Sequence, residues 1–172
     1  MTGTDVLVRR ARTTDVRGIR ELIDLYSPDR RLLSKATVTL YEDVQEFRVA
    51  VRPADGRVLG CGALHVMWED LAEIRTVAVH PDCRGRRIGH RIVAELLSAA
   101  REVGVDRVFC LTFETGFFGS FGFVEIDGAP VPPAVYEQLL RSYDEGVAEF
   151  LDLERVKPNT LGNTRMLLRL AE

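Results

Sequence analysis

The stretch from residue 73 to residue 113 limits the fold of this chain more than any other feature. It begins with a β-rich run, Glu73 to Val79, which Pro81 ends. Apolar residues then recur at helical spacing up to Gly104, and Arg107 to Phe113 is almost entirely apolar, as in a strand buried on both faces. The stretch therefore predicts a strand, a crossover helix and a second strand parallel to the first. The apolar helix positions are Ile88, Ile92, Val93, Leu96, Leu97, Ala100 and Val103.

The rest of the chain reads as short alternating elements around this unit. Pro53 to Gly56 carries turn residues between two β-rich runs, which predicts an antiparallel hairpin. We expect one α/β domain over residues 1–172, with a mixed twisted sheet, antiparallel N-terminal strands, a splayed parallel strand pair and flanking helices. Residues 144–163 receive no assignment. The other expected strands are 6–10, 47–51, 58–68, 123–126 and 165–170, and the other expected helices lie near 16–27, 40–47, 116–121 and 135–143.

Composition excludes several classes of protein. A net charge of −3 argues against a dedicated nucleic-acid binder, and no apolar run approaches the roughly 20 residues that span a bilayer. The N-terminus lacks the order of a secretory signal, so we expect a cytoplasmic protein. Cys61, Cys83 and Cys110 are widely spaced with no ligand-like histidines nearby, which predicts free thiols and no metal.

The turn before the long helix has the composition of a phosphate site. Arg84, Gly85, Arg86, Arg87, Ile88 and Gly89 lie where a strand gives way to a helix N-terminus. Unpaired N–H groups and the positive end of the helix dipole meet at such a turn. The two common nucleotide patterns, GxxxxGK[ST] and GxGxxG, are absent. We therefore expect a phosphate-bearing ligand on residues 84–89.

In its context this loop resembles that of the GCN5-related N-acetyltransferases. The likeness covers EIRTVAVHPDCRGRRIG, the following helix, RVFCLTF and FFGSFGFVEI. The family pattern [QR]xxGx[GA] is matched except that Arg87 replaces its central glycine. The resemblance implies acetyl-CoA, with its diphosphate on residues 84–89 and its pantetheine arm along Val77 and Val79. It also implies a backbone N–H near Val77 or Ala78 for the oxyanion, Phe118 beside pantetheine, a coenzyme core over about 47–126, and acceptor-side elements over about 27–47 and 130–170.

Within the family the chain most resembles the short, stand-alone amino-acid N-acetyltransferases that make N-acetylglutamate at the head of arginine biosynthesis. The signs are Glu73-Ile74, Leu111-Thr112, Phe117-Phe118 with Gly122-Phe123, and LLSKATVTLYEDVQEF over residues 32–47. The resemblance implies direct acetyl transfer to L-glutamate in a ternary complex, with L-glutamine left open as acceptor.

Roles follow from the chemistry of acetyl transfer to an amine. We expect Glu73 to be the general base, and strand alternation places it on one face with Arg75 and Val77. An amino-acid acceptor needs cations for its carboxylates, which Arg75 and, by resemblance, Lys35 supply. Thr112 is the candidate proton donor to the thiolate, because Phe117, Phe118 and Phe121 occupy the helix where many family members carry a tyrosine. Asn163 is assigned to the acceptor pocket.

Other interpretations remain open at this point. The acceptor is alternatively a protein N-terminus, a polyamine or an antibiotic amine. A non-enzyme alternative is an idle acetyl-CoA sensor, and a nucleic-acid module is disfavoured by charge. Residues 144–163 are the place to look for a homodimer contact or an acceptor lid. We read His65 as structural, Cys83 as incidental though exposed, and the phenylalanines from Phe109 to Phe123 as core and pantetheine-side packing.

Overall fold

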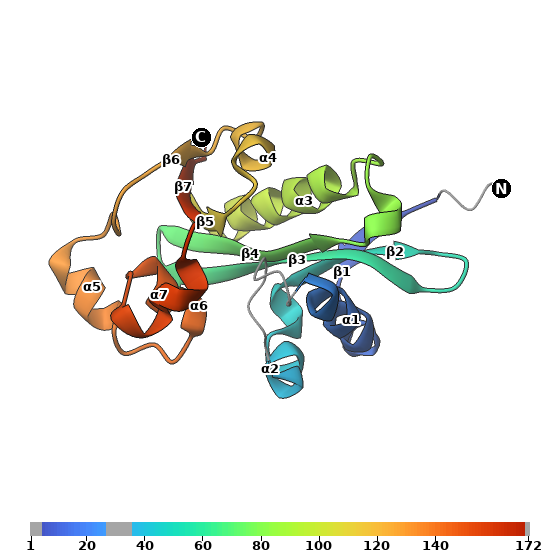
Figure 1. Cartoon of the computed structure of the whole chain (residues 1–172), viewed down its shortest axis with the longest axis horizontal. Helices are drawn as coiled ribbons and strands as arrows, with labels where there is room; N and C mark the ends of the chain where they lie inside the picture. The colour runs from blue at the N-terminus through green and yellow to red at the C-terminus, as the bar shows by residue number, and fades with distance from the viewer. Residues whose placement is uncertain (1–4, 27–35, 171–172) are drawn as a thin grey trace. The chain divides into compact units, whose positions relative to one another are not determined.

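The computed structural model describes residues 5–26 and 36–170. Lys35, assigned to the acceptor, therefore lies outside the described residues. Seven strands pair in the order β1-β2-β3-β4-β5-β7-β6, and of the pairs registered among the described strands only β4–β5 is parallel. The mixed α/β sheet is thus as predicted. The strands are labelled in Figure 1. The strands are β1 (Leu7–Arg10), β2 (Phe47–Arg52), β3 (Arg57–Trp68), β4 (Leu71–Val79), β5 (Arg107–Thr112), β6 (Val124–Glu125) and β7 (Thr164–Arg169).

The helices agree with the sequence in most places and differ in three. The segment expected as a helix over 40–47 is instead α2, which stops at Glu42, followed by a 3-10 turn, because Asp43 leaves helical geometry at φ −100° and ψ 11°. The helix expected over 135–143 ends at Leu139, and the unassigned segment 144–163 contains two short helices. The α-helices are α1 (Val16–Tyr26), α2 (Thr37–Glu42), α3 (Ile88–Val103), α4 (Thr115–Gly119), α5 (Pro133–Leu139), α6 (Glu145–Phe150) and α7 (Lys157–Thr160).

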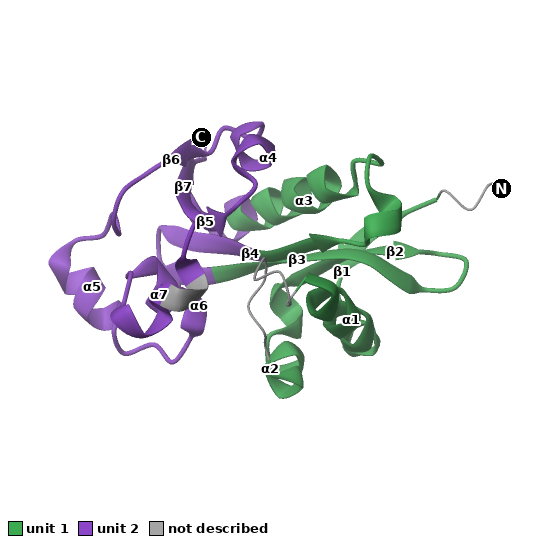
Figure 2. Ribbon diagram, viewed as in Figure 1, with its two compact units in different colours: residues 1–65, 76–100 green, residues 66–75, 101–172 purple. Residues whose placement is uncertain are grey.

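The chain forms two compact units, coloured separately in Figure 2. Unit 1 comprises residues 1–65 and 76–100, and unit 2 comprises residues 66–75 and 101–172. Strands β3 and β4 each contribute residues to both units. Each unit has its own buried apolar cluster.

In unit 1 the strands are covered by a helix on each face. The buried face of α1, with Val16, Ile19, Leu22 and Ile23, packs in one cluster with Cys61 and neighbouring strand residues. The opposite face of β3 carries Gly60 and Gly62, where an added Cβ would lie 2.9 Å from Ile92 in both cases. The missing side chains let α3 approach the sheet closely, which fixes where the N-terminus of α3 lies.

Unit 2 is built around an aromatic pair between strand and helix. Phe109 on β5 and Phe150 on α6 are fully buried, with ring centroids 4.9 Å apart in an edge-to-face arrangement. Leu139, Val147, Leu151 and Leu167 belong to the same cluster. The burial of Phe150 explains why the short helix α6 forms, because a six-residue helix depends on tertiary packing rather than on its own propensity.

The expectation that Cys83 is exposed is wrong, because its exposure is 5%. Phe113 is 45% exposed and lies outside the core, so packing on the pantetheine side stays a prediction for it. The cysteines Cys61, Cys83 and Cys110 are free thiols, as predicted.

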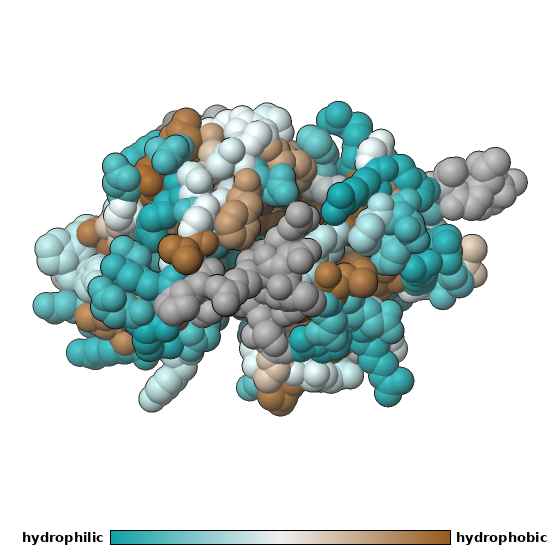
Figure 3. All heavy atoms as spheres, viewed as in Figure 1, coloured by the Kyte–Doolittle hydropathy of each residue, from teal (hydrophilic) through white to brown (hydrophobic). Residues whose placement is uncertain are grey.

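On the face shown in Figure 3 apolar residues are interspersed with hydrophilic ones. Over the described residues, every helix is too short or too polar to cross a membrane.

Candidate active site

The predicted phosphate loop is a tight, solvent-exposed turn in unit 1. Strand β4 ends at Val79, a 3-10 turn covers Pro81–Cys83, and α3 begins at Ile88. Residues 84–87 are exposed, whereas Ile88 is buried. Gly85 has φ 81° and Arg87 has φ 60°, so both adopt the left-handed conformation. Arg87 thus keeps the backbone geometry that glycine adopts without steric cost.

His80 holds the start of this loop against β3. Its backbone N–H donates to the carbonyl of Leu59 at 2.8 Å, and its Nδ1 accepts from the N–H of Asp82 at 3.2 Å. The guanidinium of Arg57 lies 3.2 Å from its Nε2. Cys83 follows, buried, with its N–H donating to the carbonyl of His80 at 2.9 Å. These contacts anchor the turn and leave the side chains of Arg84, Arg86 and Arg87 exposed.

The arrangement suits an anion. The first turn of a helix has N–H groups without intrahelical acceptors, and a 16-residue helix such as α3 carries its positive dipole end there. Three exposed arginines add charge next to that end. The loop can therefore hold a diphosphate through main-chain N–H groups and guanidinium groups together.

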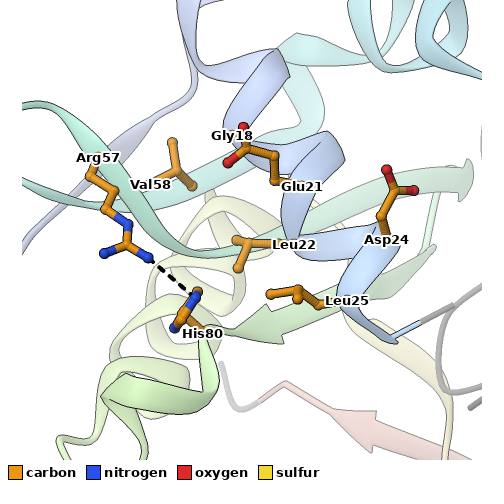
Figure 4. Close-up of a pocket in the computed structure, with 8 residues that line it drawn as sticks. All are labelled: Gly18, Glu21, Leu22, Asp24, Leu25, Arg57, Val58 and His80. Atoms are coloured by element: carbon orange, nitrogen blue, oxygen red, sulfur yellow. Dashed lines mark hydrogen bonds between the residues drawn. The ribbon is translucent and has the colours of Figure 1, made fainter. Parts of the chain in front are cut away.

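A cavity of about 380 Å³ lies in unit 1 and is drawn in Figure 4. Of the residues that line it, Arg57 and His80 anchor the loop, and α1 supplies most of the rest. None of the residues predicted for the site lines it. The eight lining residues are Gly18, Glu21, Leu22, Asp24, Leu25, Arg57, Val58 and His80.

The second half of β4 carries the backbone expected to meet pantetheine and the oxyanion. Ala78 is buried, while Val77 and Val79 are partly exposed. The carbonyl of Val79 accepts a hydrogen bond from the hydroxyl of Tyr26 on α1, a contact that sequence reasoning did not predict. Thr76 has φ 58°, which is a strained conformation for a β-branched residue. The packing around Thr76 therefore holds the backbone in a conformation that this residue would not adopt by itself.

The parallel pairing registered for β4 and β5 is short. It joins Leu71–Glu73 to Arg107–Phe109, although β4 continues to Val79 and β5 to Thr112. Glu73 is the last residue of β4 in this register. This agrees with the expectation of a splayed pair.

A buried ionic cluster surrounds Glu73 in unit 2. Nε of Arg75 lies 2.6 Å from Oε1 of Glu73, so strand alternation correctly predicted that the two side chains share a face. The two terminal nitrogens of Arg75 each donate to one oxygen of Asp144 at 2.8 Å. One guanidinium therefore bridges two carboxylates. Glu73 is 4% exposed.

Asp144 and Gly146 are functional candidates that the sequence did not identify. Asp144 caps α6, because its Oδ1 accepts from the N–H of Val147 at 2.9 Å. Gly146 packs on the cluster so closely that a Cβ there would lie 2.7 Å from Cζ of Arg75 and 2.8 Å from Oε1 of Glu73. The available signal was an Asp-Glu-Gly run in an unassigned segment, which is a common helix start and carries no catalytic pattern.

Glu149 is a further carboxyl group of the same helix. It is 7% exposed, and its Oε1 is buried without a hydrogen-bond partner among residues 5–26 and 36–170. Burial, followed by the negative charge of Glu73, raises the pKa of Glu149 to about 8. The backbone carbonyls of Glu149 and Phe150 accept hydrogen bonds from Arg165, whose guanidinium also lies over the rings of Phe109 and Phe150.

Thr112, Asn163 and Phe118 also lie in unit 2. Thr112 is buried, and its hydroxyl accepts from the N–H of Glu114 at 2.8 Å, which leaves the hydroxyl proton available for donation. Asn163 has a buried Oδ1 without a partner in the part of the chain that the structure describes. Phe118 is buried between Phe117 and Phe123. The roles of all three stay predictions.

The remaining chemical features of the site are the reactivity of Cys110 and the grouping of side chains that could bind a metal ion. Burial, with a smaller contribution from the charge of Glu73, raises the pKa of the Cys110 thiol, which keeps it protonated and poorly nucleophilic. Among the described residues, no three His, Cys, Asp or Glu side chains are grouped to hold a metal ion.

Comparison with known proteins places this chain clearly. Residues 18–123 match the model of the acetyltransferase (GNAT) family. The amino-acid acetyltransferase of Mycobacterium tuberculosis is 60% identical over 165 residues, covering 95% of this chain and 94% of that protein. The amino-acid acetyltransferase of Aeromonas salmonicida is 32% identical over 127 residues, but the match covers only 28% of that longer protein.

Comparison with solved structures also finds proteins of the same fold. A Mycobacterium tuberculosis protein in complex with CoA and NLQ has a TM-score of 0.93 at 60% identity, covering 96% of this chain and 99% of that one. N-acetylglutamate synthase from Neisseria gonorrhoeae, complexed with coenzyme A and N-acetyl-glutamate, has a TM-score of 0.76 at 24% identity over 98% of this chain and 36% of that one, which is a likeness of fold. The family match, the near-complete relative and the mixed sheet lead to one conclusion: this chain belongs to the GNAT family of acetyltransferases.

Proposed function

We propose that the chain transfers the acetyl group of acetyl-CoA to the α-amino group of L-glutamate, the first step of arginine biosynthesis, with L-glutamine as the alternative acceptor. The observation that carries the proposal is the 60% identity, over 95% of the chain, to an amino-acid acetyltransferase. The likeness of residues 32–47 to enzymes that make N-acetylglutamate favours glutamate.

The predicted phosphate loop, residues 84–89, supports acetyl-CoA as the acetyl donor. Residues 84–89 combine a helix N-terminus with exposed arginines, which is the donor set a diphosphate requires. The Mycobacterium tuberculosis structure that is 60% identical to this chain contains CoA. In this proposal, Val77, Ala78 and Val79 supply main-chain groups to the pantetheine arm and the oxyanion.

The ionic cluster supports an amine acceptor with a carboxylate. Glu73 takes one proton from the acceptor ammonium group, and the neutral nitrogen attacks the thioester carbonyl, whose electron pair moves to the oxyanion as the C–N bond forms. The oxyanion then re-forms the carbonyl and the C–S bond breaks. Thr112 gives its hydroxyl proton to the departing thiolate and regains a proton from the newly acylated nitrogen. Arg75, Lys35 and Asn163 receive the acceptor's polar groups. Alignment of two bound reactants contributes roughly 7–11 kcal/mol, so positioning outweighs proton abstraction in this scheme.

The cysteines support direct transfer without an acyl-enzyme. All three are buried, and burial raises the pKa of the Cys110 thiol, which keeps it protonated. A buried protonated thiol is a poor nucleophile for a thioester. In this proposal the donor and the acceptor are therefore bound together.

A screen of the twenty free amino acids tests the proposal, with acetyl-CoA held constant and thiol release as the readout. We expect the highest kcat/KM with L-glutamate and the next highest with L-glutamine. No thiol release with any amino acid, from protein that is folded by circular dichroism, would refute the proposed reaction and favour an idle acetyl-CoA sensor.

Lys35→Ala tests the acceptor assignment separately. The variant should raise the KM for the amino acid and leave that for acetyl-CoA unchanged. An effect confined to the KM for acetyl-CoA would remove Lys35 from the acceptor site.

A further inference from the structure

Glu149 is a buried carboxyl group that the proposed reaction does not use. It is 7% exposed, and its Oε1 has no hydrogen-bond partner within the described ranges. Burying a polar atom without a partner costs free energy, so such an atom in a native structure calls for a physical reason. The reason lies in what surrounds it.

The helix that carries Glu149 is packed against the Glu73–Arg75 ion pair. Gly146 lies three residues earlier, on the same face of α6, and a Cβ added there would meet Cζ of Arg75 at 2.7 Å and Oε1 of Glu73 at 2.8 Å. At the N-terminus of α6, Asp144 binds the same guanidinium through both oxygens. Glu149 is thus on the helix face that packs on this guanidinium, and the positive charge of Arg75 acts on it electrostatically.

The remaining charges around Glu149 are occupied elsewhere. Glu145 pairs with Arg155 at 2.7 Å, and Arg165 on β7 donates to the backbone carbonyls of residues 149 and 150. On β5, Cys110 is a protonated thiol. Within residues 5–26 and 36–170, Arg75 is the cation whose charge favours the ionised form of Glu149, so an ionised Glu149 would compete for it.

At neutral pH the competition is suppressed. Burial, and after it the charge of Glu73, raises the pKa of Glu149 to about 8, so the carboxyl holds its proton at pH 7. In that state it adds no negative charge to the pair formed by Glu73 and Asp144.

We propose that Glu149 is a positioning residue that acts through Arg75. Protonated, it leaves the guanidinium shared between Glu73 and Asp144; ionised, it draws the guanidinium toward itself and displaces Glu73 from its working position. The inference rests on the proposed function, in which Glu73 is the base. It adds a carboxyl group that must stay neutral for that base to be held in place.

The kinetic test compares Glu149→Gln with the wild type from pH 6 to pH 10, with acetyl-CoA and the amino acid as substrates. The ratio of kcat/KM, variant over wild type, should be near one at pH 7 and rise to roughly tenfold at pH 9, because one unit above its pKa only about a tenth of Glu149 is protonated. The ratio cancels ionisations that both proteins share. A ratio that does not change with pH would overturn the proposal.

Glu145→Gln is the matched control. Glu145 is on the same helix but is exposed, with an exposed arginine partner. Its ratio to the wild type should not rise with pH, because the charge of Glu145 raises the pKa of Glu149 and its removal lowers that pKa. A rise equal to that of Glu149→Gln would show that any loss of charge on α6 has the effect, and would also overturn the proposal.

A second measurement needs no variant and no turnover. In 15N-labelled wild-type protein, the Nε–H resonance of Arg75 should shift with pH at an apparent pKa near that of the Glu149 side-chain carboxyl, followed by 13C. An Arg75 resonance that ignores the Glu149 titration would refute the coupling. If no amino acid is acetylated while this coupling is present, the proposed function fails and the positioning relationship stands.

Discussion

Gly146 on α6 approaches Arg75 on β4 so closely that a Cβ at position 146 would lie 2.7 Å from the guanidinium carbon. The helix backbone thus forms one wall of the ionic cluster. Because Arg75 also binds Glu73 and Asp144, anything added at position 146 pushes on all three charges.

Gly146→Ala should separate activity from stability. The atoms that the new methyl group meets are the ends of flexible side chains, which can move, so the free energy of unfolding should change by less than about 1 kcal/mol. Their displacement should lower kcat/KM by between about ten- and a hundredfold. Gly116→Ala on α4, where an added Cβ meets nothing within 4 Å, is the control and should leave both quantities unchanged. Unaltered kinetics in Gly146→Ala would show that this wall does not position the cluster.

Arg87 has φ 60° in a loop position that its family fills with glycine, so backbone strain and charge can be tested apart. Arg87→Gly and Arg87→Ala both remove the guanidinium, but only glycine relieves the strain. We expect Arg87→Gly to be more stable than Arg87→Ala by about 1 kcal/mol in denaturant unfolding. Both should raise the KM for acetyl-CoA if the guanidinium contacts its diphosphate. Equal stability of the two variants would contradict the left-handed geometry.

Glu73→Gln should lower kcat/KM by about a hundredfold at low pH and recover part of the loss as pH rises. Without a base the reaction depends on the fraction of acceptor amine that is already neutral, which increases tenfold per pH unit below the pKa of the amine. The measurement is the pH profile of kcat/KM for both proteins. An undiminished, parallel profile would exclude Glu73 from the mechanism.

The stability of the protein should depend on pH through Glu149. Burial raises its pKa from 4.5 to about 8, so between these values the folded state binds more protons than the unfolded state. The free energy of unfolding should therefore fall as pH rises through this window, by up to about 1.4 kcal/mol per pH unit, and level off above it. Below the window both states are protonated and the contribution is constant.

Glu149→Gln should abolish this part of the slope, measured by urea unfolding at several pH values from 4 to 9. The variant should gain stability relative to the wild type as the pH increases, whereas Glu145→Gln should follow the wild type. A constant difference between Glu149→Gln and the wild type would mean that Glu149 has the same pKa in the folded and the unfolded protein, and would contradict the raised pKa.

Local sequence patterns were sufficient to predict the parts of the candidate site that lie on β4 and at the start of α3. The alternation of Glu73 and Arg75 predicted a shared face, and their side chains are in contact. The glycine and arginines before Ile88 predicted a turn at a helix start, and residues 84–87 form such a turn, which is exposed. These features depend on strand periodicity and helix geometry, which adjacent residues specify.

The tertiary structure alone decided the other half of the ionic cluster. Asp144, Gly146 and Glu149 belong to a six-residue helix with no amphipathic run long enough to recognise, and α6 is held by the packing of Phe150 on Phe109. That contact joins residues 41 positions apart and carries Asp144 to within 2.8 Å of Arg75. The protonation of Glu149 likewise depends on burial and on neighbouring charges, which no local pattern encodes.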